Sequence, residues 1–588
     1  MIFKRISAFA VTLILAVNLL CSCANINDIP ANVDVPDVTV NTPASTTEEE
    51  VTTTGDPNVP SFIVTTTPDT TATTPAPSTD DTQEETPDNT SAPEMESTKP
   101  SETTVSSNVE LPDTTTALTN EQGEIVDDYK TDLDMSKTDP DELYQMFGLD
   151  RSERAAYYED ISSKHSFPII HISTENEENI VSREEYLNCL VEIFNCDDKY
   201  VMDATSAGVR VRGNASAHYG NVNSILKEGA PYRIKFTEKQ SVLGLNDNAR
   251  CKSWVLLRTF STGIRDYLAY DMARVINDGD YYVTDAQFVQ VYVNEEYKGI
   301  YVLCEQTQAN PNRVDLNEAK DGYTGTDIGY LVELDNYATS EDWWFWLTYN
   351  KEAITDVYGE ERVPRKYHYS IKNDLYSDDQ LKYIERYMEV CWEVAMRAIR
   401  DNEYYKVDEG FNLVLAQEEF SSAYECISQV IDIKSVVDMY ILFEIANDQD
   451  LGGGSFFFAV DFGEHSRYPV LTCVAPWDFD WGYTDYYSDA DGGLYAARFK
   501  DDYFVDNWGD RSNPWLILFY SADWFQDLVK ETWQEHLDDI KATVDECYDL
   551  VKDNKKDFNY DGSSRSSRAL KNLDWVYERL DYLNEIWG

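Results

Sequence analysis

The chain reads Asn447-Asp-Gln-Asp-Leu-Gly-Gly-Gly-Ser455 after a helix-like run, and Pro476-Trp-Asp-Phe-Asp-Trp-Gly482 after the two strand-like runs that follow. Four carboxylates thus flank one expected β-hairpin. Carboxylates in such loops are suited to a hard cation such as Mg²⁺. A calcium loop or plain solvated turns are the alternatives that the composition leaves open.

The order of these residues indicates phosphoryl transfer. Protein kinases place a catalytic Asp after a helix, a metal-binding Asn five residues later, two short strands, and then the Asp of an Asp-Phe-Gly motif. Here Asp450 is followed five residues later by Ser455, then by two strand-like runs, and then by Asp478-Phe479. In this arrangement one carboxylate orients the acceptor hydroxyl and another holds the metal ion on the phosphates.

Hydrophobic periodicity outward from this segment predicts a two-lobed α+β domain, with a strand-rich first lobe and a mostly helical second lobe. Strands are expected at residues 167–172, 209–212, 232–236, 290–293, 299–304, 456–460 and 468–474. Helices are expected at residues 139–162, 264–275, 378–399, 433–446, 524–551 and 568–586. The aromatic run Trp343–Trp346 is interpreted as a core or rim insertion, with sugar stacking as the alternative.

Several further motifs occur in one order along the chain, and together they resemble the CotH kinase family of spore-coat proteins. They are Val211-Arg-Gly-Asn-Ala-Ser216, Tyr232-Arg-Ile-Lys-Phe236, Trp254-Val-Leu-Leu257, Arg265-Asp-Tyr-Leu-Ala-Tyr270, Val293–Tyr301, Gly329-Tyr-Leu-Val-Glu-Leu-Asp335 and Asn513-Pro-Trp515. The resemblance covers about residues 167–588. It implies an atypical protein kinase fold that uses ATP and a divalent metal, Mg²⁺ or Mn²⁺, to phosphorylate serine.

The resemblance assigns roles to the acidic residues. Asp450 is the predicted catalytic residue, with Asp448 as the alternative. Asp478 is predicted to hold the metal with help from Asp480. Ser455 stands where kinases have the metal-binding Asn, and a hydroxyl is a weaker ligand than an amide oxygen.

Four further residues are predicted to bind the nucleotide. Lys235 resembles the lysine that pairs with the ATP phosphates, and a solvent-facing strand lysine is its alternative. Arg212 and Asn214 are predicted to line the cleft, or else to form a tight turn with a structural Arg. Glu305 either pairs with Lys235 or simply lies on its hairpin. The sequence has no Gly-x-Gly-x-x-Gly loop.

The N-terminal region predicts export and anchoring. Lys4 and Arg5 precede an apolar run too short to span a bilayer, and Leu20-Cys-Ser-Cys23 resembles a bacterial lipobox. We therefore expect a signal peptide over residues 1–23, lipid on Cys23, and a lipid-anchored, extracytoplasmic location at the cell membrane. An ordinary secretory signal or an uncleaved anchor is the alternative.

Residues 24–126 are rich in Thr, Pro, Ser, Asp and Glu, a composition that cannot bury enough apolar surface to fold. They predict a disordered stalk before a domain at residues 127–588. The net charge of −60 argues against nucleic-acid binding, which needs clustered Lys and Arg.

The sequence contains neither a His-Glu-x-x-His nor a Gly-x-Ser-x-Gly motif, which argues against zinc proteases and α/β-hydrolases. The predicted function is a surface-anchored kinase acting on Ser or Thr of an extracytoplasmic protein. The alternative is a non-catalytic adhesin on a kinase-like fold. The sequence decides neither the oligomeric state nor the pairing of the eight cysteines beyond the signal.

Overall fold

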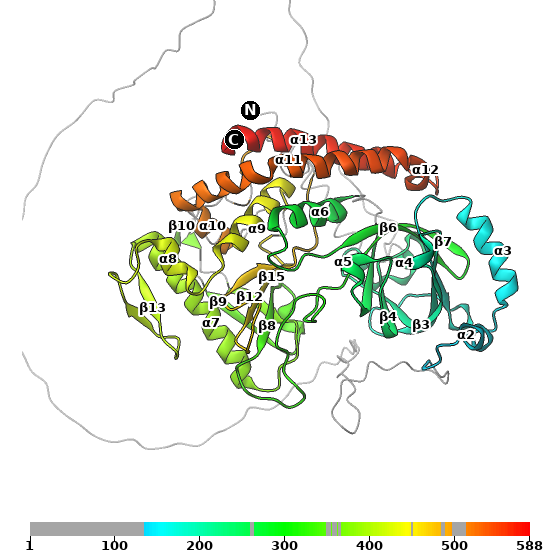
Figure 1. Cartoon of the computed structure of the whole chain (residues 1–588), viewed down its shortest axis with the longest axis horizontal. Coiled ribbons are helices and arrows are strands. Elements are labelled where there is room, and N and C mark those ends of the chain that lie inside the picture. Colours follow the sequence, from blue (N-terminus) through cyan, green and yellow to red (C-terminus); the bar gives the residue numbers. More distant parts are fainter. Residues whose placement is uncertain are drawn as a thin grey trace, which may run out of the picture. The chain divides into compact units, whose positions relative to one another are not determined.

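The computed structural model describes residues 135–258, 264–348, 354–355, 361–362, 366–448, 451–483, 489–494, 496 and 513–588. These residues all belong to one compact unit, which is strand-rich at first and mostly helical later (Figure 1). The predicted α+β class is therefore confirmed. The predicted signal peptide and stalk lie outside the described residues. Within the described ranges, every helix is too short or too polar to cross a membrane.

The strand-rich part is a closed seven-stranded barrel. Its strands, in order around the barrel, are β1 (Ile169–Thr174), β2 (Leu187–Phe194), β3 (Met202–Val211), β4 (Tyr232–Gln240), β5 (Cys251–Arg258), β7 (Glu296–Glu305) and β6 (Ala286–Val293). All neighbours are antiparallel except β1 and β6. Closure leaves no exposed sheet edge.

Strand β4 shows how the sequence forms this barrel. Tyr232, Ile234 and Phe236 are buried in the barrel core, whereas Arg233 and Lys235 alternate with them and are only partly buried. Because successive side chains of a strand point to opposite faces, both cations lie on the outer face.

Two helices, α2 (Pro140–Met146) and α3 (Arg151–Ser162), precede the barrel and pack against it (Figure 1). The predicted helix over residues 139–162 is thus interrupted at residues 147–150. Arg154 on α3 is 5% exposed, and its Nη2 lies 3.0 Å from Oε2 of the buried Glu192 on β2. This ion pair joins the helices to the barrel.

The second part contains an antiparallel sheet with the order β16-β15-β8-β12-β9. Its strands are β16 (Thr472–Val474), β15 (Phe456–Asp461), β8 (Gly329–Leu334), β12 (Lys366–Ile371) and β9 (Trp344–Thr348). The aromatic run therefore forms the edge strand β9, with Phe345 and Leu347 buried and Trp346 exposed. The predicted placement of this run in the core or at its rim fits this burial, and its being an insertion stays a prediction.

The helices of this part are α6 (Arg265–Asn277), α7 (Asp378–Met396), α8 (Ala423–Ser428), α9 (Ile433–Ala446), α10 (Pro514–Tyr520), α11 (Asp523–Asp553), α12 (Lys555–Phe558) and α13 (Arg565–Trp587). They precede the sheet (α6), lie between its strands β12 and β15 (α7 to α9), or follow it in the chain (α10 to α13). Helix α9 is buried along its whole length, as expected for a helix that is apolar all round. It begins after the capping side chain of Asp432 and ends at Asn447, which adopts a left-handed conformation.

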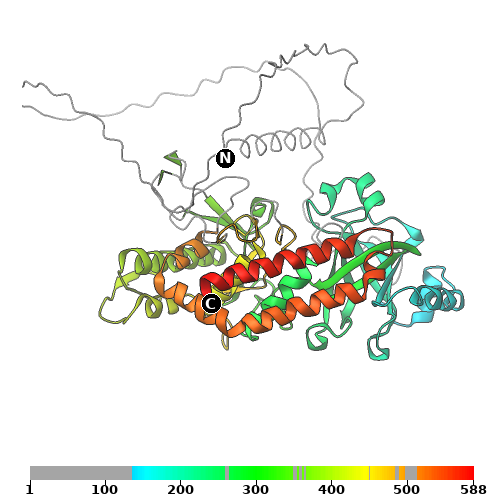
Figure 2. The same cartoon turned by 90° about the horizontal axis from the view of Figure 1, so that it is seen from above.

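Helices α11 and α13 run side by side along the long axis of the described part (Figure 2). The turn between them, which contains α12, touches the barrel side. There, Asp557 accepts hydrogen bonds from the backbone N–H of Ser166, at 2.9 Å, and from the side chain of Gln290. The C-terminal helices therefore connect the helical part to the barrel.

Candidate functional site

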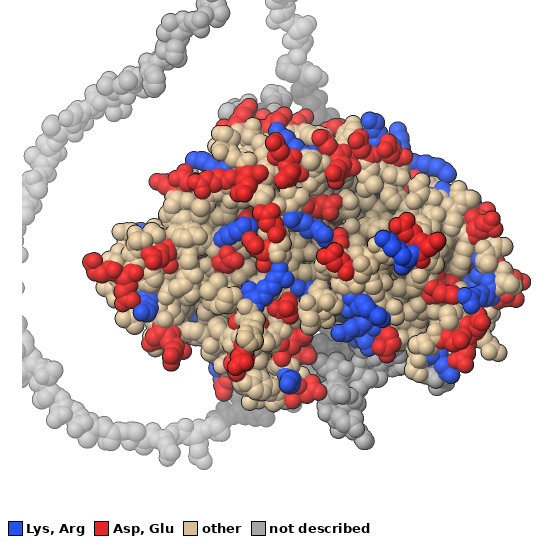
Figure 3. Space-filling view, in the orientation of Figure 1, with Lys and Arg blue, Asp and Glu red and all other residues tan. Residues whose placement is uncertain are grey.

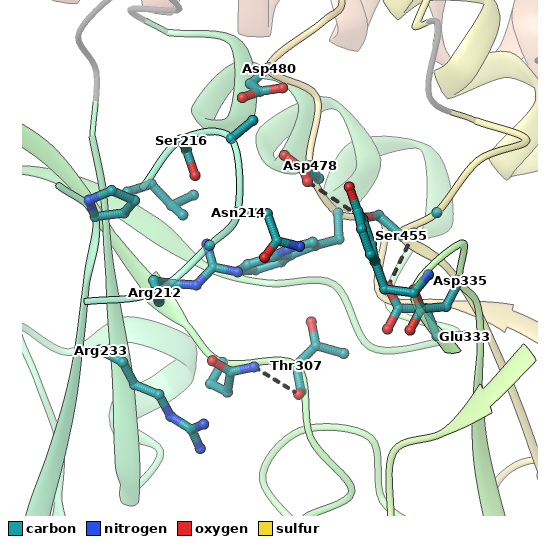
Figure 4. A pocket seen from close by; sticks show the side chains of 18 of the residues that line it. Arg212, Asn214, Ser216, Arg233, Thr307, Glu333, Asp335, Ser455, Asp478 and Asp480 are labelled. Atoms are coloured by element: carbon teal, nitrogen blue, oxygen red, sulfur yellow. Dashed lines mark hydrogen bonds between the residues drawn. The ribbon is translucent and has the colours of Figure 1, made fainter. Parts of the chain in front are cut away.

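A cavity of about 780 Å³ lies between the barrel and the five-stranded sheet. On the barrel side it is lined by the ends of β3 and β5, the start of β4, and the loop at residues 212–216. On the other side it is lined by β8 and by the two loops that flank the β15–β16 hairpin. In Figure 4, Arg212 and Arg233 lie on one side, and Ser455, Glu333 and Asp335 lie on the other.

Five arginines form the barrel side of the cavity, and we call them the arginine wall: Arg183, Arg210, Arg212, Arg233 and Arg258. Arg210 and Arg233 are register partners on β3 and β4. Burial, and then the positive charges of Arg210 and Arg212, lower the pKa of Arg233 below its ordinary value. Guanidinium groups gathered in this way favour an anion, and their forked donors match phosphate oxygens.

The surroundings make this concentration of positive charge unusual. The whole chain carries a net charge of −60, and acidic side chains predominate on the face seen in Figure 3. Within the described part of the chain, Arg183, Arg210, Arg212 and Arg233 form no ion pair with a carboxylate. Their charges are therefore available to a bound anion.

The opposite side presents oxygen ligands. Asp478 follows β16 and has φ +66°, and Ser455 precedes β15 with φ +58°. The Ser455 hydroxyl donates to Oδ2 of Asp478 at 3.5 Å, and its backbone N–H donates to Oε1 of Glu333 at 3.2 Å (Figure 4). Strand β8 and the two loops that flank the β15–β16 hairpin thus bring two carboxylates and a hydroxyl together.

Lys372 lies beside this oxygen cluster and contacts three carboxylates. Its Nζ is 2.9 Å from Glu333, 3.1 Å from Asp335 and 3.1 Å from Glu341. Burial raises the pKa of Glu333 to about 7, although the lysine charge opposes the rise. Burial and the charge of Asp478 likewise raise the pKa of Asp266, a further cavity residue, to about 7.

The structure brings five of the predicted site residues to the cavity: Arg212, Asn214, Ser455, Asp478 and Asp480. Asp450, the predicted catalytic residue, lies outside the described residues, as does Cys23. The neighbouring residue Leu451 is held in place, because the buried Asn513 side chain donates to its carbonyl at 3.0 Å.

Three predicted residues do not line the cavity. Lys235 lies two residues beyond Arg233, with its Nζ 5.9 Å from the centre of the Tyr186 ring. Glu305 is fully buried 3.5 Å from Nε of Arg313. Asp448 is 1% exposed and does not line the cavity.

Sequence reasoning missed most of the arginine wall, and also Glu333, Lys372 and Asp266. A signal for two arginines was present: in Val209-Arg-Val-Arg212 and Tyr232-Arg-Ile-Lys235, cations alternate with core residues and so share one face. No local sequence pattern could show which end of the outer face of β3 and β4 lies opposite the five-stranded sheet.

An arginine wall opposite carboxylate and hydroxyl oxygens suits a phosphate-bearing ligand. Among the described residues, no three or more His, Cys, Asp or Glu side chains gather as they would to hold a metal ion. The family model described as CotH kinase protein matches residues 209–553, which is more than half of the chain. The chain belongs to this family, and membership implies kinase activity and the use of ATP. No curated protein matches the chain.

Proposed function

We propose that the chain is a protein kinase that transfers the γ-phosphoryl group of ATP to a Ser or Thr hydroxyl of an extracytoplasmic protein. The observation that carries the proposal is the juxtaposition of the arginine wall with Asp478 and Ser455 across one cavity. A triphosphate needs cations along its length and a metal ligand at its reacting end, and this cavity presents both kinds of group.

The donor set fits a hard divalent cation. Asp478, Asp480 and Ser455 offer oxygen atoms at the cavity, which is the ligand type that Mg²⁺ and Mn²⁺ prefer. When bound, the metal supplies neutralisation of the charge on the β- and γ-phosphates. We assign Asp478 as its principal ligand because this residue follows the β15–β16 hairpin, as the metal-binding Asp does in the order of kinase motifs. Its backbone is left-handed.

In this proposal the arginine wall binds the ATP phosphates, which a glycine-rich loop and a lysine do in ordinary kinases. Arg212 and Arg233 are our assignments for the phosphate contacts, with Asn214 on the same loop as Arg212. Their work is positioning and electrostatic stabilisation, which account for most of the catalysis in phosphoryl transfer.

In the reaction, the acceptor oxygen forms a bond to the γ-phosphorus while the bond between that phosphorus and the bridging oxygen breaks. ADP leaves, and the hydroxyl proton passes to a carboxylate, for which we propose Asp450. Asp448 is the weaker candidate, because its side chain is buried away from the cavity.

A radiolabelled-ATP assay on the mature chain, with Mg²⁺ or Mn²⁺ and a Ser/Thr protein acceptor, tests this proposal. Asp450→Ala should lower turnover by about 10²–10⁴-fold and spare nucleotide binding, because general-base assistance has this size. Asp448→Ala should have a milder effect. Nucleotide binding that is absent with every divalent metal would favour the adhesin instead.

The location is part of the proposal. The Leu20–Cys23 motif supports a lipid anchor that holds the domain outside the membrane, at the end of the stalk. Mass spectrometry of the mature N-terminus should find a diacylated Cys23, and a free N-terminus elsewhere would contradict this anchor.

A further inference from the structure

We propose that Arg265 and Asp266, the first two residues of α6, are positioning residues that hold the metal loop, residues 478–480, in its working conformation. Oδ1 of Asp266 accepts a hydrogen bond from the backbone N–H of Phe479 at 2.8 Å. The Arg265 guanidinium donates to the backbone carbonyl of Asp480. Two adjacent side chains of one helix thus bind the Phe479 N–H and the Asp480 carbonyl in the segment that follows Asp478. The inference rests on the proposed function, because it concerns the residue assigned to the metal.

The metal loop needs such contacts because its backbone is strained. Asp478 has φ +66°, a region that a residue with a Cβ atom adopts only when its surroundings impose it. The side chain of Asp478 points into the cavity in Figure 4. A different backbone conformation at this residue would redirect the Asp478 carboxylate.

The residues that follow are fixed independently. Phe479 is fully buried and packs against Phe443 with ring centroids 5.1 Å apart. The Tyr483 N–H donates to the Ala446 carbonyl at 2.7 Å. The C-terminal side of the loop is therefore anchored to α9, and the contacts from α6 constrain the side nearest Asp478.

Helix α6 is suited to this positioning role because it cannot shift easily. Its inner face, formed by Leu268, Ala269, Met272 and Ile276, is buried, and it packs against α9 and α11. In the chain it follows β5, which ends at Arg258 of the arginine wall. The start of α6 thus fixes the metal loop relative to the cations that would hold the phosphates.

Asp266 could act in a second way, as an additional metal ligand, since its carboxylate also lines the cavity. The two roles need different atoms. A positioning residue needs one acceptor oxygen, which an Asn side chain retains, whereas a metal ligand needs the negative charge, which Asn lacks. Substitution by Asn and by Ala therefore separates them.

The experiment measures the Mn²⁺ dissociation constant of the full mature chain in the presence of ADP, by electron paramagnetic resonance. Asp266→Asn should stay within about threefold of wild type, whereas Asp266→Ala should bind Mn²⁺ about 10–100-fold more weakly, the usual effect of losing an outer partner of a metal ligand. Arg265→Met should weaken binding in the same direction. It serves as the second variant if Asp266→Ala does not fold.

Asp271→Asn and Asp271→Ala are the matched controls, because Asp271 lies on the same helix and does not line the cavity. Both should bind Mn²⁺ as wild type does. Equal losses in Asp266→Asn and Asp266→Ala would overturn the positioning role, and so would wild-type affinity in Asp266→Ala together with Arg265→Met. A wild-type chain that binds no Mn²⁺ with ADP would instead contradict the proposed function itself.

Discussion

Arg233 and Lys235 lie two residues apart on the same face of β4, yet only Arg233 lines the cavity. A residue of strand rises about 3.3 Å, so the two side chains start nearly 7 Å apart along the strand. That distance decides which cation can meet a phosphate. The sequence predicted Lys235 for this role, and our proposal assigns it to Arg233 because only Arg233 lines the cavity.

Arg233→Ala should weaken the binding of Mg²⁺·ADP by about tenfold or more, because a hydrogen bond to a charged group contributes about 1.5–3 kcal/mol. Lys235→Ala is the matched control, since it removes a positive charge from the same strand face as Arg233. It should change the affinity by less than about threefold, because Lys235 does not line the cavity. Isothermal titration calorimetry measures both. A larger loss in Lys235→Ala would return the phosphate role to the lysine.

Asp438 on α9 shows how burial sets the pH dependence of stability. Burial raises its pKa to about 7, although Lys434 Nζ lies 2.8 Å from its Oδ2 and opposes the rise. The folded state therefore keeps a proton that the unfolded chain releases near pH 4, so this contribution to stability is lost as pH rises from about 4 to about 7.

In the Asp438→Asn variant the side chain cannot ionise, and its amide oxygen can still accept a hydrogen bond from Lys434. Its free energy of unfolding should therefore exceed that of wild type at pH 8, by an amount on the order of 1–4 kcal/mol that shrinks toward pH 4. Urea denaturation at several pH values measures the difference, with the exposed Asp539→Asn as the control. A difference that is constant with pH, or that has the opposite sign, would contradict this account.

At the scale of elements, local signals predicted the helices better than the sheets. Helix α9 begins and ends where expected, because a capping Asp and a continuous apolar run mark it within one stretch of chain. Strand β16 is shorter than the predicted run at residues 468–474, and Pro469 and Val470 lie outside it. Strands β2 and β12 were missed, although their partners β1, β3 and β9 lie nearby in the chain.

A buried ion pair, together with the Tyr144 and Tyr158 hydroxyls that donate to Glu192, attaches α2 and α3 to the barrel. Arg154→Ala should lower the free energy of unfolding by about 3–5 kcal/mol, because it leaves the Glu192 carboxylate buried without its cation. Arg151→Ala is the matched control on the same helix. It removes half-exposed ion pairs to Asp141 and Asp203 and should lower that free energy by less than about 1 kcal/mol.

Chemical denaturation and limited proteolysis of α3 measure this contrast. The Arg154→Ala variant should also release α2 and α3 to protease before the barrel unfolds. Equal effects of the two substitutions would show that the buried pair does not hold the helices.

At the scale of the whole molecule, the distribution of charge separates the site from the surface. A strongly acidic chain repels anionic polymers, and the arginine wall provides a local exception with room for a small polyanion. The eight cysteines that the structure describes are free thiols, so the described part relies on its packed core and not on disulfides.

The residues of the site that lie close together in the sequence could be predicted, and those that lie far apart could not. Ser455 and Asp478 flank one hairpin, and their order along the chain was enough to suggest a metal and a phosphoryl group. Glu333 and Asp266 reach the same cavity from more than a hundred residues away, through β8 and α6. Only the folded arrangement shows that they meet.

The most direct test of the central claim is calorimetric titration of the full mature chain with ADP, with Mg²⁺ and without it. The account predicts binding that requires Mg²⁺ and that Asp478→Ala weakens at least tenfold while the domain stays folded, because the metal joins that carboxylate to the phosphates. Nucleotide affinity in Asp478→Ala equal to that of wild type, or no binding by wild type with Mg²⁺ or Mn²⁺, would contradict it.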